Sequence, residues 1–364
     1  MSFHLRVEPH DPLIARDGRP FGAAEGGRMK TVDWLYPSVL AGTVRTLLGE
    51  LAGLDFQRLA TIQALNGLAV HGPIAARNGQ LFVAPPKDCV RHPKTGMYYA
   101  ARPRAFEQDQ GWDLAAPGLL PVLLPDELRE DFKPERPPAL WSMKAAADWL
   151  GNPPGGGFSV DSGDKVDKLD THERTHVKIE AGSGAAEEGK LFTTTGIEFP
   201  SGLHMSARVG ADEIGEPLRR WSGLHSMGGE RRLSRFSVEP GDAWNCPEGA
   251  AKALGGSTRI RMQLVTPAIF SAGWRPEWIT RREQTGEELT LVSAAMDRWR
   301  PISGWSYVKP CGPKAVRRMV PAGSVYFFTA KSAPKALNEF WLAPVSDLPQ
   351  DRRDGFGLAI WGVW

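Results

Sequence analysis

The start of the chain combines a short alternating segment with a longer segment of helical period. From Phe3 to Val7 every second residue is apolar, which predicts a strand with one buried face. From Ser38 to about Leu51 apolar residues recur at the spacing of an amphipathic helix. Pro37 and Ser38 are favourable helix-start residues, and Gly53 favours a stop. The segment between the two elements is rich in glycine and proline, which predicts a long loop.

The rest of the chain consists mainly of short β-type segments. Strands are predicted at residues 176–179, 190–199, 203–209, 232–238, 259–265 and 324–330, and again within the final ten residues. A short helix is predicted from Ser142 to Leu150, because a run of glycines and prolines follows it. We interpret residues 71–105 as short strands and turns, and residues 107–140 as an acidic, proline-rich insertion on the surface.

This order of elements predicts an α+β fold with antiparallel sheets rather than a regular alternation of strands and helices. A single hydrophobic core rarely serves more than about 250–300 residues, so a chain of 364 residues is expected to form two domains. The simplest match is a pair of ferredoxin-like (RRM-like) domains with inserted loops, over residues 1–200 and 201–364. The first would carry the acidic insertion and a β-hairpin near residues 160–200.

Charge is distributed in patches although the net charge is only +2. Residues 86–105, 217–238 and 301–320 each carry a balance of +4, whereas residues 107–135 carry −6. The low net charge argues against a protein that coats duplex DNA. Separate patches suit a protein that binds a polyanion on one side and another protein elsewhere, although solvated loops would give the same pattern.

The sequence favours a cytoplasmic protein without a membrane segment, a metal or a cofactor. No apolar run approaches the roughly 18 residues of a membrane span, and the first twenty residues carry charges throughout. Cys89, Cys246 and Cys311 are far apart and odd in number, which is typical of reduced thiols.

One segment spells the zinc-hydrolase signature HExxH, from His172 to His176. That chemistry needs both histidines on one turn of a helix. Here the flanking residues favour a strand, in which positions i and i+4 lie about 13 Å apart and cannot share one zinc ion. A zinc hydrolase therefore remains an alternative that the context argues against.

Other features suit RNA. The segment from Ser226 to Arg232 is a glycine turn followed by two arginines, and glycines let a backbone approach a phosphate closely. The start of the helix at Ser38 offers free N–H groups and a positive dipole. Trp305 is a candidate for base stacking, with Lys314, Arg317 and Arg318 after it in the chain.

Several segments, in order, resemble a known family. They are HDPLIARDGRPF, YPSVLAGTVRTLLG, ERTHVKIE, GKLFTTTGIEF, MGGERR, VTPAIFSAGW, ISGW, GPKAVRRMVPAGSVYFF and GFGLAIWG. Together they resemble the Cmr subunit of type III-B CRISPR-Cas effector complexes that binds the 5′ tag of the crRNA, a member of the RAMP superfamily. The resemblance runs from about Leu5 to Gly362.

The resemblance implies a non-catalytic RNA-binding subunit in antiviral defence. Its implied partners are the crRNA tag, the large polymerase-like subunit, the adjacent RAMP backbone subunit and, indirectly, target RNA. The strand around His176 would form the base of a hairpin that separates tag from guide. From the residues and the resemblance together, the candidate RNA-binding residues are Arg16, Arg19, Ser38, Gly42, Arg45, His176, Lys178, Gly228, Gly229, Arg231, Arg232, Trp305, Lys314, Arg317 and Arg318.

One further alternative is a RAMP endoribonuclease that processes CRISPR repeat RNA. It would need a histidine or tyrosine positioned for general acid–base cleavage. His10, which precedes an aspartate, and His176 are the candidates.

Overall fold

The structure is a computed structural model of the chain. It describes residues 2–16, 28–29, 31–107, 111, 118–126, 128, 132–151, 157–210, 215–276, 278, 288–307 and 311–364.

The N-terminal part of the chain builds an eight-stranded sheet in the order β13-β14-β1-β12-β2-β3-β8-β9. The strands are β1 (Ser2–Pro9), β2 (Val70–Arg77), β3 (Gln80–Val83), β8 (Leu140–Ser142), β9 (Lys165–Val166), β12 (His204–Gly210), β13 (Gly223–Ser226) and β14 (Leu233–Glu239). Strand β1 is antiparallel to both of its neighbours, β12 and β14. The alternation at the start of the sequence therefore becomes a central strand.

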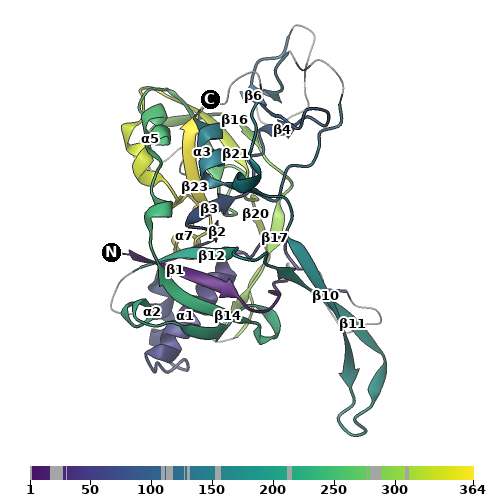
Figure 1. The fold of residues 1–364 in the computed structure, drawn as a ribbon. Coiled ribbons are helices and arrows are strands. Elements are labelled where there is room, and N and C mark those ends of the chain that lie inside the picture. The colour runs from purple at the N-terminus through teal and green to yellow at the C-terminus, as the bar shows by residue number, and fades with distance from the viewer. Residues whose placement is uncertain are drawn as a thin grey trace.

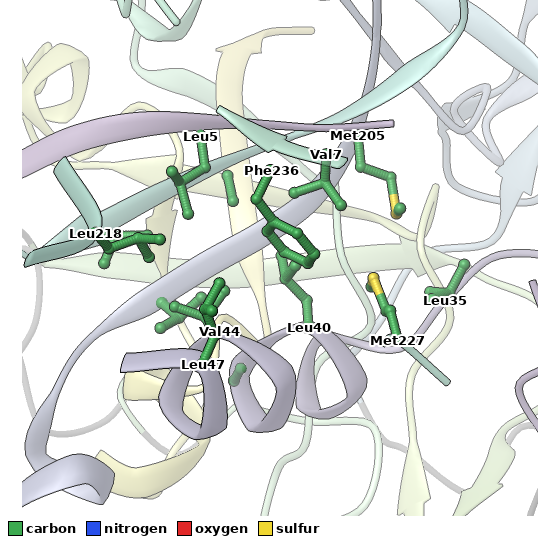
Figure 2. Close-up of a cluster of buried hydrophobic side chains, with 14 of the residues drawn as sticks. Leu5, Val7, Leu35, Leu40, Val44, Leu47, Met205, Leu218, Met227 and Phe236 are labelled. Atoms are coloured by element: carbon green, nitrogen blue, oxygen red, sulfur yellow. The ribbon is translucent and has the colours of Figure 1, made fainter. Parts of the chain in front are cut away.

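Helix α1 (Pro37–Leu51) packs on one face of this sheet, and α2 (Leu59–Gly67) follows it. Leu40, Val44 and Leu47 of α1 point toward the sheet, where they meet Leu5 and Phe236 (Figure 2). These side chains are almost completely buried. Because burying one leucine contributes about 1.5–3 kcal/mol, the apolar stripe is sufficient to fix the helix against the sheet.

The C-terminal part builds a five-stranded sheet in the order β16-β21-β15-β23-β22. The strands are β15 (Arg259–Leu264), β16 (Leu289–Ala295), β21 (Val325–Ala330), β22 (Ala343–Pro344) and β23 (Leu358–Val363). The helical segments around it are α5 (Glu248–Leu254), η4 (Lys335–Phe340) and α7 (Pro349–Arg353). Strand β23 is buried along its whole length, as its continuous apolar run predicts.

Helix α3 (Met143–Leu150) lies where the two sheets meet, and Ser142 caps its start by accepting a hydrogen bond from the Ala145 N–H. Beside it, Arg261 of β15 forms an ion pair with Asp88. Both side chains are fully buried, and Trp149 donates its indole N–H to the Asp88 carboxylate at 2.9 Å. Arg261 also donates to the Trp149 carbonyl, so the pair joins the C-terminal sheet to α3.

A long hairpin of β10 (Asp170–Ile179) and β11 (Ala186–Glu198) projects from the body of the molecule (Figure 1). Four smaller pairs are β4 (Cys89–Arg91) with β5 (Tyr98–Ala100), β6 (Arg102–Pro103) with β7 (Val122–Leu123), β17 (Arg300–Ile302) with β20 (Arg317–Met319), and β18 (Trp305–Ser306) with β19 (Gly312–Pro313). The described part of the chain also contains short helices, namely η1 (Ser162–Asp164), α4 (Glu216–Arg219), η2 (Gly229–Arg231) and η3 (Asp242–Trp244).

The predicted α+β class with antiparallel sheets is confirmed, as are both predicted helices and the hairpin. The two sheets do not divide the chain at residue 200, where the sequence predicts a domain boundary. Strands β12 and β14 follow that point in the sequence, yet they are the two neighbours of β1. The N-terminal sheet thus extends to Glu239, and the C-terminal sheet begins at Arg259.

Within the described ranges, no helix is long and apolar enough to cross a membrane. All three cysteines are free thiols.

Candidate nucleic-acid interface

A pocket of about 450 Å³ lies where the loop after β1, the start of α1, the hairpin and the turn before β14 meet. Its volume falls within the roughly 300–1,000 Å³ of small-molecule sites. The lining residues are Ile14, Ala15, Arg16, Met29, Val39, Phe192, Thr194, Gly228, Gly229 and Glu230. Four segments that are distant in the sequence therefore share one concave site.

The glycine turn is held tightly against the loop after β1. Gly228 has φ +75°, and a Cβ there would lie 2.5 Å from the Ile14 carbonyl oxygen. Gly229 donates its N–H to the same oxygen at 2.7 Å. Glu230 and Arg231 also adopt the left-handed region, with φ 55° and 50°. Such strain costs on the order of 1–3 kcal/mol per residue and persists only where the surroundings impose it.

The middle of the hairpin forms another wall, whereas its base is at Asp170 and Glu198. His176 of β10 stacks on Phe192 of β11, with ring centroids 5.1 Å apart and planes within 11°. Its Nε2 lies 2.9 Å from the Thr194 hydroxyl and 3.6 Å from Glu230 Oε1. The imidazole thus joins the hairpin to the glycine turn.

The signature from His172 to His176 lies within strand β10, opposite residues 192–196 of β11. The strand predicted for this segment is confirmed. The helical context that zinc hydrolysis requires is therefore absent from this segment. Among the described residues, no group of three or more histidines, cysteines, aspartates or glutamates is arranged to hold a metal ion.

The start of α1 contributes Ser38 and Gly42 on one face, with Val39 in the pocket wall. Ser38 is half-buried and Gly42 is exposed. A Cβ at Gly42 would meet nothing within 4 Å, so the backbone there is open to a ligand. Tyr36 precedes the helix in an extended conformation and does not cap it with its side chain, which leaves a positive end suited to an anion.

Arg45, which the sequence predicts as an RNA-binding residue, is buried. Its guanidinium is 9% exposed and pairs with Asp354 at 2.5 Å. It also donates to the Leu68 carbonyl at 2.7 Å. Its charge is neutralised inside the protein, because Asp354 of the C-terminal part of the chain lies against this side of α1.

The remaining arginines of the turn and the loop differ in accessibility. Arg231 is exposed and pairs with no other residue that the structure describes. Arg232 is instead engaged with Glu230 at 2.8 Å, and its side chain is 14% exposed. Arg16 is exposed at the pocket. Arg19 lies outside the described residues. Lys178 is exposed further along the hairpin and pairs with Glu187 at 2.6 Å.

The predicted residues after position 300 form a second surface, on the β17–β20 and β18–β19 pairs. Trp305 is 55% exposed and Lys314 is also exposed. Arg318 lies over the ring of exposed Trp299 at 4.8 Å. Arg317, by contrast, forms two 2.8 Å hydrogen bonds with the buried carboxylate of Asp351, which orients it within the protein.

The two surfaces lie on either side of the segment that leads into α1. Arg300 of β17 pairs with Asp33 at 3.1 Å, and Tyr36 packs against a buried cluster that includes Ile302 of the same strand. The sequence analysis missed Glu230 and Trp299 as site residues. Their motifs offered a signal, because a glutamate stands among the turn arginines and a tryptophan stands between two arginines.

Two cryo-EM structures share this fold. They are described as the type III-B Cmr-beta bound to cognate target RNA, one of them also with AMPPnP. Each matches with a TM-score of 0.51, at 12% and 13% sequence identity, over 89% of this chain and 86% of the matched chain. At such identities the likeness concerns the fold alone.

A crystal structure described as a Csm3–Csm4 subcomplex of the type III-A CRISPR-Cas interference complex also matches. It has a TM-score of 0.41 and 10% identity, over 92% of this chain and 98% of that one. No curated protein matches the sequence.

The sequence itself matches one family model, described as CRISPR-associated protein (Cas_Cmr3), over residues 5–364. The match covers the sheets, the hairpin and the pocket, and it confirms the resemblance that the ordered motifs predicted. The chain belongs to the Cas_Cmr3 family of CRISPR-associated proteins.

Proposed function

We propose that this chain is the non-catalytic, RNA-binding subunit of a cytoplasmic type III-B (Cmr) CRISPR-Cas effector complex, and that it anchors the repeat-derived 5′ tag of the crRNA. One observation carries the proposal. The loop after β1, the start of α1, the glycine turn and the middle of the hairpin enclose one pocket, and exposed arginines adjoin it. In a member of the Cas_Cmr3 family, that site has the shape and charge for one end of a single strand of RNA.

Phosphate contacts would position the RNA, and the hairpin would fix its register. Arg231 and Arg16 offer exposed guanidinium groups at the turn and the loop. The uncapped start of α1 adds a positive dipole, and open Gly42 lets a sugar–phosphate backbone approach closely. Beyond α1, Trp305 and the Arg318–Trp299 pair supply rings on which unpaired bases stack.

The two sheets support a pair of ferredoxin-like units. In the first, the strands β1, β2, β12 and β14 lie in the spatial order β14-β1-β12-β2, with α1 between β1 and β2. In the second, β15, β16, β21 and β23 lie in the corresponding order, β23-β15-β21-β16. Each is the 4-1-3-2 order of a split β-α-β fold, a common platform for single-stranded RNA.

The proposed partners are the large polymerase-like subunit and the adjacent RAMP backbone subunit, with target RNA met indirectly. The matched cryo-EM chains come from complexes described as bound to target RNA. The hairpin of β10 and β11 projects from the body of the molecule and is thus suited to reach a neighbouring subunit (Figure 1).

Crosslinking of the assembled complex tests the proposal. Tag nucleotides are expected to link to peptides that contain Ser38, Gly229 or Arg231. Links confined to the guide region, or to none of these peptides, would contradict it. Co-purified small RNA with a uniform 5′ end is the accompanying expectation.

The endoribonuclease alternative is tested separately. His176 at the pocket and exposed His10 are its candidate general acid–base groups. Incubating the purified chain with repeat RNA is expected to leave the RNA intact. Clean, metal-independent cuts that disappear in H176A or H10A would replace the non-catalytic proposal with this one.

A further inference from the structure

The chemistry of the pocket walls suggests which part of an RNA enters it. Most of the lining is apolar, from Ile14, Ala15, Met29 and Val39. Phe192 adds an aromatic ring that is already aligned by His176. Apolar walls with one aromatic ring suit a flat nucleobase better than a phosphate, because a phosphate entering such walls would lose its hydration without compensation.

Of the polar side chains in the wall beside His176, the Glu230 carboxylate only accepts hydrogen bonds, whereas the Thr194 hydroxyl both donates and accepts. Glu230 and Thr194 both line the pocket, and both flank His176 Nε2. Glu230 Oε2 accepts from Arg232 at 2.8 Å. Its Oε1 lies 3.6 Å from His176 Nε2, which is too long for a hydrogen bond. Since a carboxylate has about four lone-pair sites, Glu230 retains capacity to accept from a ligand.

We propose that this pocket holds one unpaired nucleobase and selects it through Glu230, with guanine bound most tightly and uracil least. The inference rests on the proposed function, because it takes the ligand to be single-stranded RNA. Guanine presents its N1–H and N2–H donors side by side, so both can donate to a carboxylate, either to its two oxygens or to one of them. Adenine and cytosine offer an amino group only. Uracil turns carbonyl oxygens toward the carboxylate on both sides of its single N–H.

The conformation of the glycine turn supports this role for Glu230. Its backbone is held at φ 55° between Gly229 and Arg231, while Gly228 and Gly229 are locked to Ile14. Arg232 then fixes the carboxylate. A preorganised acceptor costs little to order when the base arrives, and so discriminates more sharply than a mobile side chain.

Binding of the full-length chain to short single-stranded RNAs tests the inference. The probes are fluorescein-labelled octa-uridylates in which one guanosine, adenosine or cytidine replaces uridine at each position in turn, measured by fluorescence anisotropy. At one position, guanosine is expected to lower the Kd by about tenfold relative to uridine, the discrimination typical of a good bidentate contact. E230Q keeps the side-chain volume and is expected to remove most of that preference.

R231A is the matched control in the same turn, and is expected to weaken all the probes by a similar factor. If the wild-type chain binds every probe equally, yet R231A weakens binding, the base-selective pocket is wrong and the proposed RNA-binding function stands. If E230Q retains the full guanosine preference, the assignment of Glu230 is wrong. If no probe binds to the chain or to the assembled complex, both proposals fail together.

Discussion

Arg45 and Asp354 form a 2.5 Å ion pair between residues 309 positions apart in the sequence. The first lies on α1 beneath the N-terminal sheet, and the second follows α7 beside the C-terminal sheet. Both side chains are largely buried, at 9% and 14% exposure. The helix whose start faces the pocket is therefore oriented by the other half of the molecule.

We expect R45A to lower the free energy of unfolding by about 3–5 kcal/mol, because it leaves the buried Asp354 carboxylate unpaired. Urea denaturation measures this change. R58A is the control, since Arg58 pairs with Asp55 on the exposed surface and such pairs contribute less than about 1 kcal/mol. If R45A is as stable as the wild type but binds RNA more weakly, Arg45 contacts RNA after all.

Removal of the Arg231 charge is expected to weaken RNA binding without loss of stability. An exposed arginine that contacts one phosphate should also reduce the slope of log Kd against log salt by about one unit. The test is to measure the Kd at salt concentrations from about 50 to about 300 mM, a range over which phosphate contacts are progressively screened. R235A provides the control, because Arg235 is exposed on the neighbouring strand β14. Equal slopes in wild-type and R231A protein would contradict a phosphate contact.

Gly228 and Gly42 should respond in opposite directions to alanine. G228A introduces a Cβ 2.5 Å from the Ile14 oxygen at a positive φ, so we expect a loss of about 1–3 kcal/mol in stability. G42A meets nothing within 4 Å inside a helix and should stabilise by about 0.5–1 kcal/mol. Thermal unfolding measures both. A drop in RNA affinity for the more stable G42A would indicate that RNA approaches the bare backbone there.

The second surface should contribute stacking energy. We expect W305A to weaken binding of single-stranded RNA by about 1–3 kcal/mol, the usual effect of removing one base–aromatic stack. Trp305 is 55% exposed, so the fold should tolerate the change. F56A is the control, because Phe56 is an exposed aromatic residue beyond the opposite end of α1. Equal losses in the two variants would argue against a specific stack.

Stability should fall as the pH drops below about 6.5. Burial and the nearby Arg208 guanidinium lower the pKa of His71 from 6.5 to about 4. Below pH 6.5 the unfolded chain binds a proton at His71 that the folded chain does not bind, so the loss of stability grows as the pH falls from 6.5 to about 4 and persists below that. The full cost is about 3 kcal/mol near pH 4. Urea unfolding at pH 7.5 and 5.0 should show a smaller loss in H71Q than in wild type, whereas exposed H172Q should behave as wild type.

Much of the local structure could be predicted from the sequence. Hydrophobic periodicity and the glycine and proline residues at helix ends identified α1 and α3. Segments of alternating or β-branched residues identified β1, β12, β15 and β21. The segment from His172 to His176 could also be read as a strand, because its neighbours lack a helical stripe. These features depend on residues close together in the chain, where local sterics and side-chain periodicity decide the outcome.

The strand pairing, the exposure of charges and the pocket depend on contacts between residues that are distant in the sequence. No periodicity indicates that β12 and β14 pair with β1, so the sequence could not show that the first sheet continues past residue 200. The sequence identified Arg45 as a candidate RNA-binding residue, but only the packed C-terminal part places Asp354 against it. Likewise, the glycine turn was visible as MGGERR, whereas its role as one wall of a pocket depends on Ile14 and Phe192. The sequence by itself determined which elements form and which family the chain resembles. Tertiary structure decided which charges remain exposed, because an arginine is available to RNA only where no buried carboxylate already neutralises it.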